Sequence, residues 1–213
     1  MAITLSKLGV PLAGGGDSSK NQGLLMPKLK YRYRVTFTNF GAGVGDSHEL
    51  TKQVMTAGRP GVQFENIELA VYNSKINYAG RYTWAEVSIV LRDDMTNAVS
   101  RLVGQQIQKQ FDFFEQSSAS SGADYKFQTN IEILDGGNGA YEPVVLERFE
   151  MYGCYLQNTV YQQADYKSSE PMDITLTIKY DNAIQTNSPE PGGQAIGLGE
   201  AVGRAGFKLA LGG

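Results

Sequence analysis

Residues 59–92 read RPGVQFENIELAVYNSKINYAGRYTWAEVSIVLR, and this stretch organises the interpretation of the whole chain. Two strand-like runs, Phe64–Tyr72 and Trp84–Arg92, flank a polar segment at Asn73–Gly80. A tight turn needs only about two to five residues, so this connection is longer than a turn requires. It also carries two apolar side chains, Ile76 and Tyr78, in polar surroundings. We therefore predict a protruding arm that contacts a neighbouring copy of the same protein.

The composition indicates a folded protein rather than a disordered one. The chain has 213 residues, of which 41% are hydrophobic and 19% charged, enough for one sizeable β domain with extensions or for two small domains. The net charge of -3 argues against a general nucleic-acid binder, which would carry a basic patch. The single cysteine, Cys154, excludes a disulfide within the chain. We see no signal peptide and no membrane-spanning run, so we expect a soluble product without a membrane anchor, made in the cytoplasm.

Alternation of apolar and polar residues predicts most of the chain to be strand. Lys30–Phe40 places Tyr31, Tyr33, Val35 and Phe37 on one face, and Met172–Tyr180 alternates in the same way. Further strands are predicted at Glu49–Thr56, Tyr125–Leu134, Pro143–Leu156 and Thr159–Gln163, with a bulge or a change of buried face near Arg148–Glu150.

One segment changes period and predicts a helix at about 95–116. Val99, Val103, Ile107, Phe111 and Phe114 recur every three or four residues, and Asp93, Asp94 and Thr96 precede them as capping candidates. The expected fold is therefore mainly β, an antiparallel barrel or sandwich with one flanking α-helix. We expect the folded domain at 29–182, between an N-terminal arm at 1–28 and a glycine-rich C-terminal extension at 183–213.

Histidine and cysteine, two residue types that often carry chemistry, occur once each. The one histidine, His48, is most simply a turn residue, and one histidine with one cysteine cannot form a familiar zinc site. Glu147 and Glu150 lie three apart on a predicted strand, so they point to opposite faces and do not form an acid–base pair. We therefore predict no catalytic residues, no cofactor and no metal, and a protein that is not an enzyme.

Two parts of the chain resemble the tail tube proteins of contractile-tailed bacteriophages, a family related to the tube proteins of type VI secretion systems. The first is Asn73–Arg92, followed by Asp93–Phe111 where that family has its helix. The second is Tyr152–Tyr180, with Gly153-Cys154-Tyr155 and a closing strand that ends at Lys179-Tyr180-Asp181. Together the matches cover about 30–182.

The resemblance implies a small β-barrel whose hexameric rings join their sheets into one inner barrel and stack into a hollow tube. It also implies a virion tail assembled in the host cytoplasm. The implied partners are further copies of the chain, the tail sheath protein, a tape-measure protein inside, baseplate and tail-terminator proteins, and genomic DNA that passes without specific binding. On this interpretation the inter-subunit arm consists of Tyr72, Asn73, Ser74, Lys75, Ile76, Asn77, Tyr78, Ala79, Gly80 and Arg81.

A conduit for DNA needs a polar wall without free cations, because lysine and arginine would retain phosphates. The polar strand faces that carry Thr36, Thr38, Thr175 and Thr177 are the predicted lumen lining. Two alternatives remain open: a secretion-system tube subunit, and a monomeric β-barrel that binds a ligand in an apolar pocket.

Overall fold

The structure is a computed structural model that describes residues 28–41, 47–135 and 143–187. The chain divides into two compact units, 1–32 and 33–213. In the first unit, the Arg32 amide donates to the Leu29 carbonyl, and the Arg32 guanidinium lies over the Tyr31 ring. Both predicted terminal extensions lie largely outside the described residues.

The second unit contains all the helices and strands that the described residues form. In chain order these are β1 (Tyr33–Thr38), α1 (Ser47–Gln53), β2 (Val54–Ala57), β3 (Val62–Val71), β4 (Ser74–Trp84), β5 (Val87–Arg92), α2 (Ala98–Gln110), β6 (Phe111–Asp112), β7 (Ser117–Ser118), α3 (Gly122–Tyr125), β8 (Phe127–Leu134), β9 (Val145–Tyr161), β10 (Asp173–Lys179) and β11 (Asn182–Asn187).

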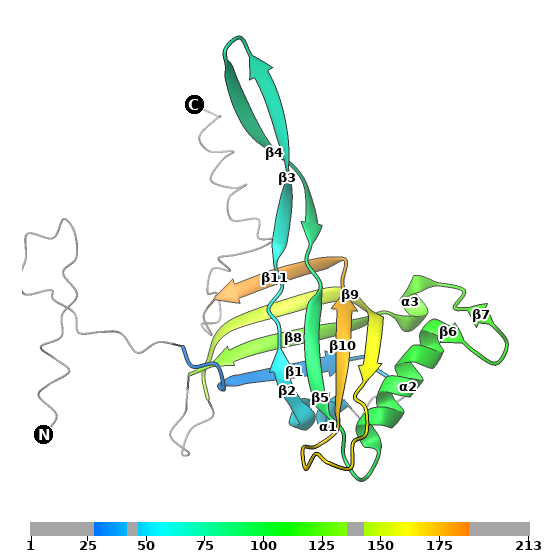
Figure 1. Cartoon of the computed structure of the whole chain (residues 1–213). Coiled ribbons are helices and arrows are strands. Elements are labelled where there is room, and N and C mark those ends of the chain that lie inside the picture. Colours follow the sequence, from blue (N-terminus) through cyan, green and yellow to red (C-terminus); the bar gives the residue numbers. More distant parts are fainter. Residues whose placement is uncertain (1–27, 42–46, 136–142, 188–213) are drawn as a thin grey trace, which may run out of the picture. The chain divides into compact units, whose positions relative to one another are not determined.

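The main sheet is antiparallel and has the strand order β1-β8-β9-β10-β5-β2, with β11 also paired to β9. The long strand β9 lies in the middle of this sheet and takes part in both of its halves. Its residues 145–154 pair with β8, and its residues 155–161 pair with β10. We call β1, β8, β11 and the first part of β9 the first half-sheet, and β2, β5, β10 and the rest of β9 the second half-sheet. In Figure 1 the strands of the two half-sheets run in crossing directions.

Both half-sheets direct their apolar faces into one core. The first contributes Val35, Phe37, Phe127, Ile131, Phe149 and Met151, and the second contributes Val87, Ile89, Leu91, Ile174, Leu176 and Ile178. Because side chains alternate along a strand, the residues between these point away from the core, on opposite sides for the two half-sheets. The prediction of a mainly β, antiparallel fold is confirmed. The strand path is open, ending at β1 and β2, and is not a closed barrel.

Strand β9 changes its buried face at Gly153. Phe149 and Met151 are buried before it, and Cys154 and Leu156 after it. Gly153 has φ +67°, and a Cβ there would collide with the Asp181 side chain, so only glycine fits without strain. The predicted change of face therefore exists, but it lies a few residues beyond Arg148–Glu150.

Helix α2 packs Val99, Leu102 and Val103 into the core. Two glutamines attach it to the rest of the fold. Gln106 is buried, accepts from the Gly41 amide and donates to the Tyr125 carbonyl. Gln110 bonds both the amide and the carbonyl of Leu156, at 2.9 and 3.0 Å, as a neighbouring strand would.

The helix is shorter than predicted. It ends at Gln110, and Phe111 is extended, with φ -151°. The Asp112 carboxylate accepts hydrogen bonds from the backbone amides of Glu115 and Phe114, which turns the chain out of the helix. The Glu115 amide, followed by the Gln108 side chain and the Phe114 amide, lowers the pKa of Asp112. Phe114, predicted to lie on the apolar face of the helix, is exposed.

Several other predicted boundaries are wrong. Residues expected to form one strand at Glu49–Thr56 form α1 and then β2, because Ser47–Gln53 is rich in helix-forming residues. Thus α1 and α3 accompany the single expected helix. The separate strands predicted at Pro143–Leu156 and Thr159–Gln163 form one strand, β9, and 182–187 forms β11 rather than loose extension.

Candidate functional site

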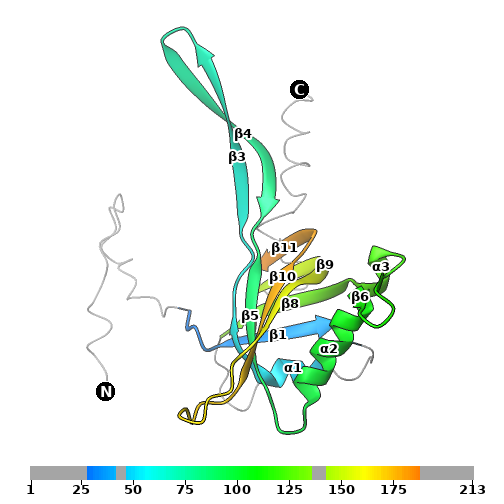
Figure 2. The ribbon, with the colours of Figure 1, turned by 45° about the vertical axis from the view of Figure 1, so that its right-hand side comes forward.

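The predicted arm is a two-stranded hairpin, β3 and β4, which extends away from both half-sheets (Figures 1 and 2). Its turn consists of Tyr72 and Asn73, between the paired residues Val71 and Ser74. The expectation of a long connection at Asn73–Gly80 is therefore wrong: most of that segment is strand β4. Ile76 and Tyr78 are spaced two apart because they share one face of this strand.

The outer part of the hairpin has one apolar face. Along β3 this face carries Ile67, Leu69 and Val71, and the cross-strand partners of Ile67 and Leu69 are Tyr78 and Ile76. The exposed fractions of these five side chains are 53%, 51%, 44%, 52% and 43% respectively. A contiguous apolar face of this kind on an extended hairpin makes it a candidate interaction surface. We call it the arm's apolar face.

The opposite face of the same segment is polar. Lys75 and Glu68 form an ion pair at 2.7 Å, and the Asn66 side chain donates to that of Asn77 at 3.2 Å. All four residues are exposed. The outer hairpin is therefore a ribbon with one face suited to water and one suited to a partner.

A bulge separates the outer hairpin from its base. Gly80 and Arg81 of β4 together oppose Glu65, between the pairs Asn66–Ala79 and Phe64–Tyr82. A Cβ at Gly80 would lie only 3.0 Å from the Glu65 carbonyl oxygen, so glycine permits this close approach.

Below the bulge, the aromatic residues of the hairpin connect it to the core. The ring centroids are 6.5 Å apart for Phe64 and Tyr82, 5.7 Å for Tyr82 and Trp84, and 5.6 Å for Trp84 and Tyr180. Tyr180 is buried. By strand alternation, Phe64 lies on the other face of β3 from Ile67. Of the hairpin's rings only Trp84 packs against the core, because Phe64 and Tyr82 are 60% and 58% exposed. The described hairpin therefore exposes aromatic side chains at its base as well as the apolar face near its tip.

The tip residue Tyr72 combines two unusual properties. Its φ is +56°, a left-handed conformation that bulky residues rarely adopt, and its side chain is fully exposed. No contact within the described chain explains an aromatic side chain at this position. The remaining predicted arm residues, Ser74 to Arg81, all lie on β4.

The four predicted lumen residues divide between the half-sheets. Thr36 and Thr38 lie on β1 and point away from the core, and Thr175 and Thr177 do the same on β10. They therefore lie on opposite sides of the core and belong to two different surfaces.

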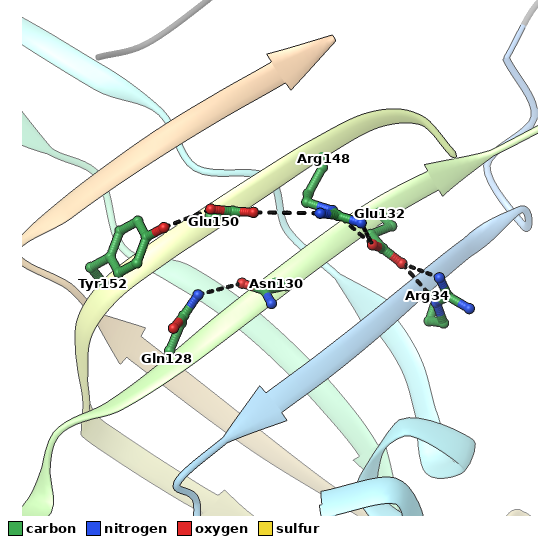
Figure 3. Close-up of polar contacts among 7 residues, drawn as sticks. All are labelled: Arg34, Gln128, Asn130, Glu132, Arg148, Glu150 and Tyr152. Carbon is green, nitrogen blue, oxygen red and sulfur yellow. Dashed lines mark hydrogen bonds and ion pairs between the residues drawn. The ribbon is translucent and has the colours of Figure 1, made fainter. Parts of the chain in front are cut away.

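The surface around Thr36 contains a charged network that the sequence did not reveal. It joins Arg34 of β1, Glu132 of β8, and Arg148, Glu150 and Tyr152 of β9 (Figure 3). The alternation of β1 and β8 indicated that Arg34 and Glu132 face outward. The pairing of strands about a hundred residues apart, which brings them together, has no local signal.

No described group of side chains is arranged for catalysis. Burial raises the pKa of the Cys154 thiol to about 11, which suppresses the reactive thiolate. Glu147 faces Gln185 and Arg59, whereas Glu150 faces Tyr152 on the other side of β9. The described residues form no cluster of metal-ligating side chains, and the side chain of His48 lies outside them.

Two hollows of about 630 and 500 Å³ occur on the described surface. The larger is lined by the β9–β10 loop, mostly by polar side chains such as Gln162, Asp165 and Glu170. The smaller lies between the end of α2, α3 and β9. Neither is the enclosed apolar pocket that a ligand-binding barrel would have. Among the described helices, none is both long and apolar enough to cross a membrane.

No protein-family model and no curated protein matches this chain. Solved structures do. A chain in the cryo-EM structure of the anti-feeding prophage cap, described as the AFP tube terminating cap, aligns with a TM-score of 0.58 and 12% identity over 82% of this chain and 100% of that one. A chain of the sheath–tube complex of the extracellular contractile injection system PVC, in its extended state, aligns with a TM-score of 0.53 and 12% identity over 76% of this chain and 92% of that one. A chain of the AFP baseplate aligns with a TM-score of 0.54 and 11% identity over 78% of this chain and 100% of that one.

These chains share less than an eighth of their residues with this one, so the likeness lies in the fold. The protein has the fold of component chains of contractile injection particles, which agrees in fold with the resemblance to tail tube proteins that the sequence predicted.

Proposed function

We propose that this protein is the structural subunit of a hollow tube in a contractile tail or injection particle. The observation that carries the proposal is the hairpin arm: edge-to-face and tilted aromatic contacts link its base to the core, yet the apolar side chains near its tip are exposed. A monomer gains nothing from exposing that face to water, whereas an assembly buries it. The likeness to chains of a tube-terminating cap and a sheath–tube complex supports the same conclusion.

Within the assembly, the arm of one copy packs its apolar face on a second copy. The sheet supplies a second contact. Strands β1 and β2 end the strand path, so each pairs with only one neighbouring strand among the described residues. Pairing β1 of one copy with β2 of the next would join the main sheets of neighbouring copies into a ring and pair these two edges. We propose hexameric rings of this kind, stacked along the tube axis and tied together by the arms.

The tube serves as a conduit. We propose a phage tail that delivers DNA inside a contractile sheath, with tape-measure protein in the lumen and baseplate and terminator proteins at the ends. A secretion-system tube with protein cargo is the alternative. In both cases the proposed role is structural rather than catalytic.

Sedimentation of the purified protein across a range of concentrations tests the proposal. A tube subunit shifts from small species to rings and long polymers as the concentration rises. A ligand-binding monomer would instead stay near 23.2 kDa at every concentration, and that result would refute the proposed function.

A further inference from the structure

The outward face of the first half-sheet holds two arginines on a single carboxylate. Arg34 donates through Nε to Oε2 of Glu132 at 2.7 Å, and its Nη2 lies 2.6 Å from the same oxygen. Arg148 approaches from the other side, with Nε and Nη2 at 2.8 and 2.7 Å from Oε1. Glu132 lies on the strand between them, so each of its oxygens is held by one guanidinium (Figure 3).

The burial of these groups is unequal. The Glu132 side chain is only 6% exposed, whereas those of Arg34 and Arg148 are 49% and 44% exposed. The carboxylate therefore lies beneath two guanidinium groups that solvent reaches. Planar guanidinium groups bind carboxylates and phosphates through the same pair of N–H donors, so donors occupied by Glu132 are not available to a phosphate.

The rest of the network leaves this surface electrically neutral. Glu150 accepts from Tyr152 at 2.6 Å and lies 3.6 Å from Arg148, so two carboxylates balance the two guanidiniums. Beside them, Gln128 donates to Asn130 at 3.1 Å, and neither carries a charge. The Cα partners of these two residues on β1 are Thr38 and Thr36, which extends the neutral area.

We infer that Glu132 masks Arg34 and Arg148 and so keeps this face from binding polyanions such as nucleic acid. The inference rests on the proposed function in one respect, because a wall that does not retain phosphates is what a DNA conduit needs. The inference also assigns this face, with Thr36 and Thr38, to the lumen. Removing the Glu132 charge leaves this surface net positive, with Glu150 still beside Arg148, and releases the guanidinium donors that Glu132 held to bind up to two phosphates.

The test is binding of a fluorescently labelled DNA duplex by the full chain, followed by anisotropy. We expect no binding by the parent protein and clear binding by Glu132→Gln at low salt. With two phosphate contacts, the affinity should fall about 12-fold between about 50 and 200 mM salt. Glu68→Gln is the matched control, because it removes one negative charge and frees Lys75 on the exposed arm; it should bind no better than the parent protein.

A second variant keeps the inference testable. In the Glu132→Gln, Arg34→Gln, Arg148→Gln triple variant the sheet retains a similar shape without the two cations, and DNA binding should disappear. A folded Glu132→Gln variant that binds DNA no better than Glu68→Gln overturns the inference. Strong binding by the triple variant does so as well. Tube assembly is scored separately by sedimentation, so failure of the proposed function would be seen in the parent protein whatever the DNA result.

Discussion

Replacing Leu69 and Ile76 by threonine tests the arm's apolar face quantitatively. The two residues are cross-strand partners, exposed by 51% and 43%, and threonine keeps the preference for a strand. Burying the exposed half of such a side chain contributes about 1 kcal/mol, so the pair should weaken each arm contact by about 2 kcal/mol. Because about 1.4 kcal/mol corresponds to a factor of ten, the critical concentration for assembly should rise about 30-fold. Pelleting of polymer across a concentration series measures it.

The control is Glu68→Thr with Asn77→Thr, the neighbouring cross-strand pair on the polar face of the same hairpin. These side chains contribute little apolar area, so the critical concentration should change by less than about threefold. Circular dichroism should be the same for both double variants and the parent protein. If the Leu69 and Ile76 variant assembles at the parental concentration while remaining folded, the arm's apolar face is not an assembly contact.

Three further substitutions and one labelling experiment test particular features of the chain. Gln110→Ala removes two hydrogen bonds to Leu156, and the free energy of unfolding should fall by about 2 kcal/mol in urea denaturation. Gly153→Ala forces a side chain into a left-handed conformation at a crowded position, and should lower the melting temperature through a loss of at least about 1–2 kcal/mol. Burial raises the pKa of the Cys154 thiol to about 11, so the thiol is ionised in about one molecule in a thousand at pH 8, and a thiol reagent should label it only after unfolding. The folded state holds this proton more tightly than the unfolded state does. The thiol's contribution to the free energy of unfolding is therefore complete below about pH 9 and is lost as the pH rises towards 11. Tyr72→Gly should relieve about 1 kcal/mol of backbone strain and slow hydrogen exchange in the hairpin, yet hinder assembly if the exposed ring is a contact.

Local alternation was sufficient where a strand has one buried face. The predicted inward residues Val35 and Phe37 of β1, and Ile174, Leu176 and Ile178 of β10, are all buried. Tyr31 and Met172, predicted on the same faces, precede these strands and are exposed. These strands needed no tertiary information, because the period of two already separates their faces.

The errors arose where a local hydrogen bond or a short segment overrides the pattern. Phe111 and Phe114 continue the helical period, but the Asp112 carboxylate offers the backbone a turn instead. In the arm, period two does hold across Ile76 and Tyr78, yet the polar residues between them were interpreted as a connection. Strand β4 is exposed on both faces within one chain. A sequence interpretation that expects each strand to bury one face in its own chain therefore assigns such a segment to a loop.

Long-range pairing accounts for what the sequence could not reveal about the candidate site. The masking of Arg34 and Arg148 by Glu132 depends on the register of β1 and β9 against β8. Taken alone, each of these residues is an ordinary outward-facing charge. The sequence suggests that arginine is unsuited to a lumen wall, and only the pairing of these arginines with Glu132 removes that objection.

Electron microscopy of the purified protein at high concentration tests the central claim most directly, because a tube subunit must form tubes. We expect hollow, unbranched tubes built of stacked rings from the parent protein, and isolated rings or small species from the Leu69→Thr, Ile76→Thr variant at the same concentration. Only dispersed particles of about 23.2 kDa from the parent protein, under conditions in which it is folded, would contradict the account.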